Sequence, residues 1–308
     1  MSREAGSSTP STPEGPADLE RLRQGDEAAW DEVVRAHGGK LLAVARRIVR
    51  DEHAAEDCVQ NALVQAFLKI GDFQERAALA TWLHRIVVNA ALMMLRAQGR
   101  RAEQPLDDLL PAFDEYGHRV VESGPAPTSP EELAERAEAR EIVERAIDAL
   151  PDAFRVVLVL RDFEDLSTQE VADLLQLTPN AVKIRLHRAR AALKTLIERP
   201  HRRAPERVPT PLVRRITGIV GRYMPLTITC QEFDGFIMDY LEGSLPERPR
   251  RLFEIHVLRC RECRTYLKRY KQTLALGHRI CREDAEALPA DAPPRLVAAI
   301  AKARAGRA

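Results

Sequence analysis

The chain has 308 residues, of which 30% are charged and 5% are aromatic, and its 47 Lys and Arg nearly balance its 46 Asp and Glu. Roughly 100 to 200 residues make one domain, so this length predicts two or three. The composition favours amphipathic helices over sheets and predicts an all-α fold. No segment approaches the roughly 18 consecutive apolar residues of a membrane span. We therefore expect a soluble, cytoplasmic protein with no membrane contact, whose five cysteines form no disulfide framework.

Proline-rich and acidic stretches interrupt the helical periodicity and divide the chain. In chain order, we predict a disordered tail (1–16), a first helical block (17–101), a linker (102–130), a second helical block (131–199), a proline-containing linker (200–213), a third block (214–277) and a tail (278–308). The first two blocks are thus joined by a flexible linker, and a small domain follows them.

The first block contains a helix with two different faces, in the stretch DEHAAEDCVQNALVQAFLKI (51–70). At 100° per residue, one face is apolar and contains Ala55, Cys58, Val59, Ala62, Phe67 and Ile70. The second face carries Asp57, Gln60, Asn61 and Val64 and resembles a docking surface. We call these four residues the docking face.

A further helix follows in the stretch TWLHRIVVNAALMMLRAQGRR (81–101). Its predicted buried stripe contains Trp82, Leu83, Ile86 and Ala90. Its end is basic, with Arg96, Arg100 and Arg101.

The second block contains the start signals of two consecutive helices. Ser167 and Glu170 have the spacing of a capping box, which predicts a helix from Thr168 to about Gln176. Thr178 is a second N-cap, and Pro179 fits the first helical position because its missing N–H has no partner there anyway. Two capped helices with a tight turn between them predict a helix-turn-helix.

The second of these helices has the pattern of a DNA-reading helix. Its apolar stripe contains Val182, Leu186, Ala189 and Leu193. The side chains predicted to meet base edges near its N-terminal end are Asn180, Lys183, Ile184 and His187, and Thr178 is also predicted to bind DNA. Those predicted to reach phosphates along its flanks are Arg185, Arg188, Arg190 and Lys194.

These motifs together resemble the sigma-70 family of bacterial RNA polymerase sigma factors, in its compact extracytoplasmic-function (ECF) form. AEDCVQ (55–60) is similar to the core-binding helix of region 2, and TWLHRIVVN (81–89) to the promoter-melting segment. LPDAFRVVLVLRDFEDLSTQEVADLL (150–175) with AVKIRLHRARAAL (181–193) is similar to region 4.

The resemblance implies that the docking face binds the clamp of core RNA polymerase and that region 4 reads the −35 element of promoter DNA. It also implies that the −10 element is recognised and opened by a set that contains Phe73, Gln74, Asn89, Arg96 and Arg100. No nucleophile with a paired base, glycine-rich phosphate loop or carboxylate dyad stands in the sequence, so we expect no enzyme activity.

The third block has the spacing of a metal site. His256, Cys260 and Cys263 follow an H-x3-C-x2-C pattern, and Cys230 lies upstream, before a predicted helix, a turn at Gly243 and a second helix. Three thiolates and one imidazole favour one structural Zn²⁺ in tetrahedral coordination. With the intervening DYLEGSLP, the pattern resembles the zinc-binding anti-sigma domain.

Three roles for the third block remain open from sequence. The metal only stabilises a small helical domain, or the domain regulates a sigma factor, in its own chain or in a separate partner. A third role is metal or redox sensing, in which Cys281 is either a resolving thiol or a spare cysteine. For the whole chain, the alternatives to a sigma factor are a stand-alone helix-turn-helix regulator and a purely protein-binding anti-sigma module.

Overall fold

The computed structural model describes residues 16–74, 78–98, 105–120, 138–198 and 228–287. They belong to two compact units, residues 1–101 with 282–308 and residues 102–281. Within the described ranges the regular elements are all helical, and an isolated β-bridge joins Phe113 and Arg119. The all-α prediction is therefore confirmed. None of the helices in these ranges combines the length and the hydropathy needed to cross a membrane.

Parts of the predicted organisation lie outside the described residues. They are the tail up to residue 15, the basic end at Arg100 and Arg101, residues 102–104 and 121–130 of the first linker, the start of the second block (131–137), the linker at 200–213, the start of the third block (214–227) and the tail from residue 288 onward.

The first unit contains α1 (Pro16–Arg23), α2 (Glu27–Val49), α3 (Glu52–Lys69), the short η1 (Ile70–Asp72) and α4 (Leu79–Gln98). Two aspartates fix helix starts, because each side chain accepts a hydrogen bond from an N–H in the first turn that has no helical partner. Asp26 accepts from Ala29 N at 3.1 Å, and Asp51 accepts from Ala54 N at 2.7 Å.

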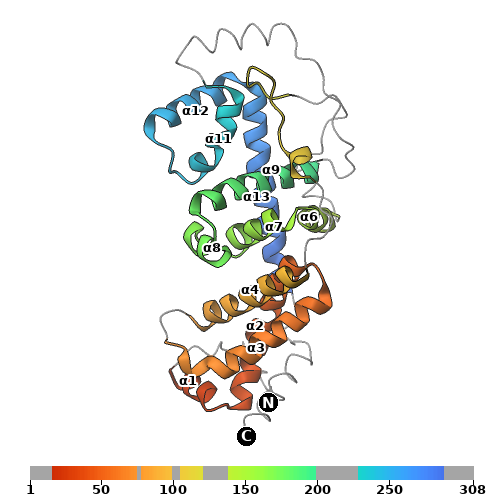
Figure 1. Cartoon of the computed structure of the whole chain (residues 1–308), viewed down its shortest axis with the longest axis vertical. Helices are drawn as coiled ribbons and strands as arrows, with labels where there is room; N and C mark the ends of the chain where they lie inside the picture. Colours follow the sequence, from red (N-terminus) through yellow and green to blue (C-terminus); the bar gives the residue numbers. More distant parts are fainter. Residues whose placement is uncertain (1–15, 75–77, 99–104, 121–137, 199–227, 288–308) are drawn as a thin grey trace, which may run out of the picture. The chain divides into compact units, whose positions relative to one another are not determined.

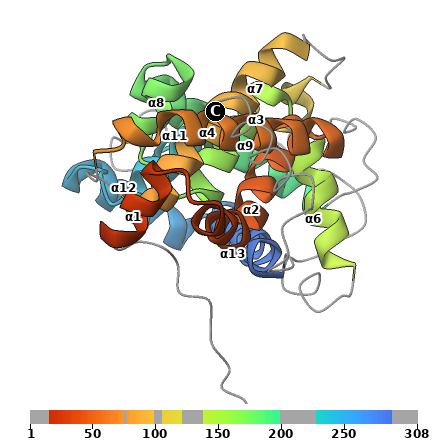
Figure 2. The ribbon, with the colours of Figure 1, turned by 90° about the horizontal axis from the view of Figure 1, so that it is seen from below.

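The helices α2, α3 and α4 pack against one another around an apolar core (Figure 1; Figure 2). Trp30 meets Phe67 edge-on at 5.4 Å, and its indole N–H donates to Leu22 O. The predicted apolar face of α3 is buried at all six positions, Ala55, Cys58, Val59, Ala62, Phe67 and Ile70.

The buried stripe of α4 differs from the predicted one. Leu83 is buried, but Trp82, Ile86 and Ala90 are only half-buried, whereas Val87 and Val88 are in the core. The reason is that α4 packs against both α2 and α3. A helix with two neighbours buries a wider and differently oriented face than a single amphipathic stripe indicates.

In the second unit, the predicted helix-turn-helix is confirmed. The elements before it are α6 (Ala139–Asp148), α7 (Asp152–Leu158) and a π-helical turn η3 (Val159–Phe163). The helix α8 (Thr168–Leu175) begins with the capping box of Ser167 and Glu170 and ends at Gln176, whose φ is +55°. The helix α9 (Pro179–Glu198) begins where Thr178 accepts from Ala181 N at 3.1 Å.

Three further helices, α11 (Cys230–Leu241), α12 (Glu247–Arg259) and α13 (Arg261–Ala287), form what we call the C-terminal domain. Thr229 and Glu232 make a second capping box at the start of α11. Gly243, with φ +70°, makes the predicted turn between α11 and α12, where an L side chain is strained. The helix α13 continues through residue 277 to Ala287, beyond the predicted end of the third block.

Stacked rings form the core of the C-terminal domain. The ring of Phe253 stacks on Phe233 at 4.5 Å and on Tyr240 at 4.2 Å. The long α13 extends from this core and crosses α9 (Figure 1), where Arg269 Nη1 lies 3.9 Å from Glu198 Oε1. The C-terminal domain and the helix-turn-helix are therefore packed together within one unit.

Candidate functional site

Helix ends bring the four predicted metal ligands together. Cys230 is the first residue of α11, His256 lies in the last turn of α12, Cys260 follows that helix, and Cys263 lies in the first turn of α13. One ligand atom of each lies within 4.8 Å of the others. The structure thus places the predicted set in one cluster.

The cluster fits a tetrahedral zinc ion. Cys230 Sγ and Cys260 Sγ are 4.0 Å apart, close to the separation of about 3.8 Å that two Zn–S bonds of 2.3 Å give at a tetrahedral angle. Cys230 and Cys263 are buried, and the ring of His256 stacks on Phe233 at 5.3 Å. Its Nε2 is buried with no hydrogen-bond partner. Cys260 and His256 are half-buried, and such a largely enclosed set of three thiols and an imidazole is typical of a structural site.

The predicted DNA-reading residues of α9 divide into two groups. Lys183, His187 and Arg190 follow one another at four- and three-residue steps and face the C-terminal domain. The other predicted side chains are exposed at Thr178, Asn180, Ile184 and Arg188 and half-buried at Arg185. The structure therefore brings one stripe of the predicted reading face into an intramolecular contact.

Carboxylates of α11 and the turn after it bind the first of these side chains. Lys183 Nζ lies 3.0 Å from Asp239 Oδ1 and 3.2 Å from Glu242 Oε2. The hydrogen bond to Asp239 is the largest cause that holds the pKa of Lys183 above its ordinary value. Because these side chains are about one-third exposed, each ion pair contributes only about 0.2 to 1 kcal/mol.

The contact between His187 and Asp234 is more deeply buried. His187 Nε2 donates to Asp234 Oδ2 at 2.9 Å, with side chains 17% and 12% exposed. Burial by itself raises the pKa of Asp234, but the hydrogen bond from His187 and the charge of Arg119 outweigh it, so that the pKa is lowered. Asp234 is therefore a buried carboxylate that is ionised while both partners are in place.

Arg190 and Lys194 complete this stripe of α9. Arg190 Nε donates to the buried Asp162 at 2.8 Å, and its Nη1 lies 3.2 Å from Met238 Sδ of α11. Lys194 Nζ donates to Glu198 at 2.7 Å and lies 4.6 Å from the centre of the Tyr266 ring. Burial lowers the pKa of Lys194. Arg190 thus has a structural role in this unit, beyond the phosphate contact predicted for it.

In the first unit, the docking face lies on the surface of α3. Asp57 and Asn61 are exposed, and Gln60 and Val64 are half-buried. The same face continues to Leu68, which is 46% exposed. Leu68 was not among the predicted docking residues, although its spacing of four from Val64 places it on the same face of the helix.

The predicted −10 residues have different environments. Asn89, Arg96 and Gln74 are exposed. Phe73 is only 6% exposed and packs against Trp82 at 5.2 Å. In this structure Phe73 therefore supports its loop and offers no surface to DNA.

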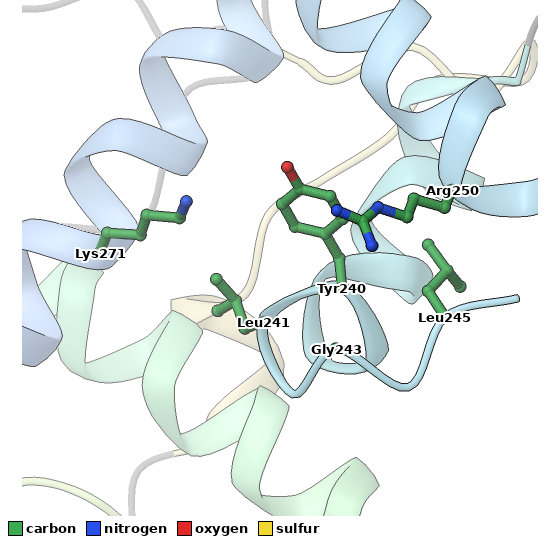
Figure 3. A pocket seen from close by; sticks show the side chains of 6 residues that line it. All are labelled: Tyr240, Leu241, Gly243, Leu245, Arg250 and Lys271. Atoms are coloured by element: carbon green, nitrogen blue, oxygen red, sulfur yellow. The ribbon is translucent and has the colours of Figure 1, made fainter. Parts of the chain in front are cut away.

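A cavity of 220 Å³ opens in the C-terminal domain. Figure 3 shows its lining, which consists of Tyr240, Leu241, Gly243, Leu245, Arg250 and Lys271. The Lys271 ammonium lies 5.7 Å from the centre of the Tyr240 ring. The lining contains none of the four metal ligands and none of the carboxylates that contact α9.

Three families match the chain, in the order that the motifs predicted. Sigma-70 region 2 matches residues 33–101, Sigma-70 region 4 matches residues 140–193, and Putative zinc-finger matches residues 230–264. The match to both sigma regions supports a sigma factor over a stand-alone helix-turn-helix regulator.

Curated relatives resemble the first two blocks. RNA polymerase sigma-H factor of Pseudomonas aeruginosa is 34% identical over 184 residues, which cover 58% of this chain and 92% of that protein. ECF RNA polymerase sigma-E factor of Escherichia coli K12 is 33% identical over 181 residues, with the same coverage of 58% and 92%. The solved structure of CnrH in complex with the cytosolic domain of CnrY is 26% identical, covers 59% of this chain and 95% of its own, and has a TM-score of 0.38.

Residues 33–193 thus span both sigma regions, and the relatives matched by this part are similar along nearly their whole length. The zinc-finger match coincides with the Cys and His cluster. The chain belongs to the ECF group of the sigma-70 family of RNA polymerase sigma factors, and it carries a domain of the Putative zinc-finger family after region 4.

Proposed function

We propose that this chain is a cytoplasmic sigma factor that binds core RNA polymerase, directs it to promoters and is restrained by its own C-terminal domain. The docking face binds the polymerase clamp, the helix α4 with the loop before it acts at the −10 element, and α9 reads the −35 element. The observation that carries the restraint is the pairing of Lys183 and His187 with acidic residues of α11 and its turn.

The restraint follows from competition for the same side chains. A recognition helix contacts base edges and phosphates with its cations and hydrogen-bond donors. Lys183 donates to Asp239 and His187 donates to Asp234, so neither group can contact DNA while the C-terminal domain is bound. The carboxylates also place negative charge where phosphates would lie. Docking of the domain and reading of the −35 element are therefore mutually exclusive.

The metal has a structural role in this proposal. Zn²⁺ bound by Cys230, His256, Cys260 and Cys263 joins the start of α11 to the end of α12 and the start of α13. The ion thereby orients α11, which carries Asp234 and Asp239. No step of transcription passes through the metal itself.

The first test concerns the docking face. Replacing Asp57 by Lys and Gln60 by Ala should weaken the complex with core polymerase by about tenfold or more, because both side chains lie on the exposed side of α3. Promoter-dependent transcription from a linear template should fall in parallel. Affinity is measured by titrating labelled core polymerase.

A matched control is Glu52→Lys, an exposed position at the start of the same helix, outside the docking face. It should leave core affinity near that of the parent chain. Equal affinity of the parent and the double variant would reject the proposed docking face and, if transcription also stays unchanged, the placement of polymerase on α3.

A second test separates base reading from phosphate binding on α9. In a chain that ends at Arg203, Lys183→Ala should change the preference among −35 sequences by about 1 to 3 kcal/mol, whereas Arg188→Ala should weaken binding to all sequences alike and lower the salt dependence. Binding to a panel of −35 duplexes at several salt concentrations gives both quantities. Equal losses on every duplex for Lys183→Ala would contradict its base-reading role.

A further inference from the structure

Part of the predicted linker folds as a hairpin, residues 112–120, which we call the linker hairpin. Asp114 Oδ1 accepts from the N–H groups of Tyr116 and His118, each at 2.9 Å. Val120 N donates to Ala112 O at 2.8 Å and closes the hairpin. Gly117 has φ +75°, a conformation that L side chains rarely adopt.

The linker hairpin contacts the start of α11. Gln231 N donates to Gly117 O at 3.0 Å. A Cβ added at Gly117 would lie 3.1 Å from Thr229 Cβ, so the two backbones approach closely. His118 Nδ1 lies 4.0 Å from Cys230 Sγ. Because an N–H in the first turn has no acceptor within its own helix, the Gly117 carbonyl satisfies a donor that α11 itself leaves open.

Arg119 anchors the linker hairpin more deeply. Its side chain is buried, and its Nη2 donates to Asp234 Oδ1 at 2.8 Å. Its guanidinium lies 3.6 Å from the centre of the Tyr266 ring on α13. The other oxygen of Asp234 accepts from His187 of α9. One buried carboxylate thus binds a linker side chain and a DNA-reading side chain at the same time.

We propose that the C-terminal domain binds the linker hairpin together with α9 and that Arg119 stabilises both contacts. This inference rests on the proposed restraint of α9. It adds the linker hairpin, a segment of the same chain, as a second segment that the C-terminal domain binds. A buried carboxylate is costly unless its hydrogen bonds are satisfied. With Arg119 in place, Asp234 stays ionised and binds His187; without Arg119, it keeps one donor and its contact with α9 weakens.

The test uses the full, zinc-loaded chain with Arg119→Met, which retains an unbranched apolar side chain against Tyr266 but removes the charge. The first readout is hydrogen exchange of the Gln231 amide by NMR, because its acceptor is Gly117 O. We expect exchange at least about tenfold faster. The second readout is affinity for a promoter duplex, which should rise by about tenfold because His187 and Lys183 become available.

Two further variants guard against a general folding defect. Arg119→Lys keeps the charge but not the planar group, and should give intermediate values in both readouts. Gly117→Ala disturbs the hairpin from its other side, against Thr229, and should shift both readouts in the same direction as Arg119→Met. Asp108→Asn, at an exposed position of the same linker, is the matched control and should change neither. Zinc content near one ion per chain verifies the domain in each variant.

The outcomes separate this inference from the proposed function. Unchanged hydrogen exchange of the Gln231 amide in Arg119→Met and Gly117→Ala overturns the proposal that Arg119 stabilises both contacts. Faster exchange without tighter DNA binding overturns it as well. Reversing Asp239 and Glu242 to Lys provides the comparison. If that charge reversal raises DNA affinity and Arg119→Met does not, only the proposed role of Arg119 is rejected. If neither variant does, the restraint itself is rejected with it.

Discussion

Deletion of all residues after Arg203 is expected to raise the affinity of the chain for duplex promoter DNA by roughly 30-fold. The buried hydrogen bond from His187 to the charged Asp234 contributes about 2 kcal/mol, and 1.4 kcal/mol corresponds to a tenfold change in affinity. The apparent affinity rises because a larger fraction of molecules has an accessible α9. Fluorescence anisotropy with a labelled −35 duplex measures the change.

The shortened chain retains what the curated relatives have. The 184 residues similar to the Pseudomonas aeruginosa factor cover 92% of that protein, and the matches to regions 2 and 4 end at residue 193. We therefore expect it to fold and to bind core polymerase as the full chain does. Runoff transcription should rise together with DNA affinity. Lower transcription at equal core affinity would instead indicate that the C-terminal domain supports the sigma part.

A full-length variant isolates the electrostatic part of this prediction. Asp239→Lys with Glu242→Lys should raise DNA affinity by about fivefold, because two partly exposed ion pairs with Lys183 are replaced by repulsion. The control, Glu247→Lys with Glu254→Lys, makes the same change in net charge on α12, at the exposed Glu247 and the half-buried Glu254, which also form ion pairs with arginines. Equal gains in the two variants would assign the effect to net charge and contradict a specific contact with α9.

Loss of the metal should unfold the C-terminal domain. Cys260→Ser with Cys263→Ser is expected to reduce bound zinc from about one ion per chain to none. Zinc binding supplies on the order of 10 kcal/mol of apparent folding free energy in small domains, which by themselves bury little surface. Because α11 loses its position with the metal, DNA affinity should rise to the value of the shortened chain.

Metal analysis, circular dichroism and DNA binding on one preparation test this prediction. Helical signal should fall by the contribution of α11, α12 and part of α13, and a strong chelator should produce the same change in the parent chain. Cys58→Ala and Cys281→Ala are the matched controls, because both thiols are buried outside the ligand cluster. Full zinc content in the double Ser variant would reject the ligand set, and unchanged DNA affinity after zinc loss would reject the coupling to α9.

Local structure was predictable where the type of one or two residues specifies a helix start or a turn. The capping box of Ser167 and Glu170 and the N-cap Thr178 start their helices at the predicted positions. Gly243 makes the predicted turn with a positive φ. Each of these interactions spans only a few residues, so the sequence contains both partners side by side.

The prediction was weaker wherever a helix has several neighbours. The stripe of α4 that contains Trp82 and Ile86 is half-buried, and Val87 and Val88 fill the core in its place. Phe73 is buried against Trp82, although the family resemblance implied that it contacts the −10 element. Periodicity identifies an apolar face but not the number or direction of the helices that pack against it.

The sequence by itself determined the all-α fold, the helix-turn-helix and the clustering of Cys230, His256, Cys260 and Cys263, because residue type and characteristic spacing specify each of them. Only the tertiary structure decided which stripe of α9 is exposed. The side chains that contact Lys183 and His187 lie 56 and 47 positions away along the chain, and Arg119 meets Asp234 across 115 positions. A basic helix face has the same pattern whether water, DNA or a carboxylate faces it, so its partner here followed from the packing of distant segments.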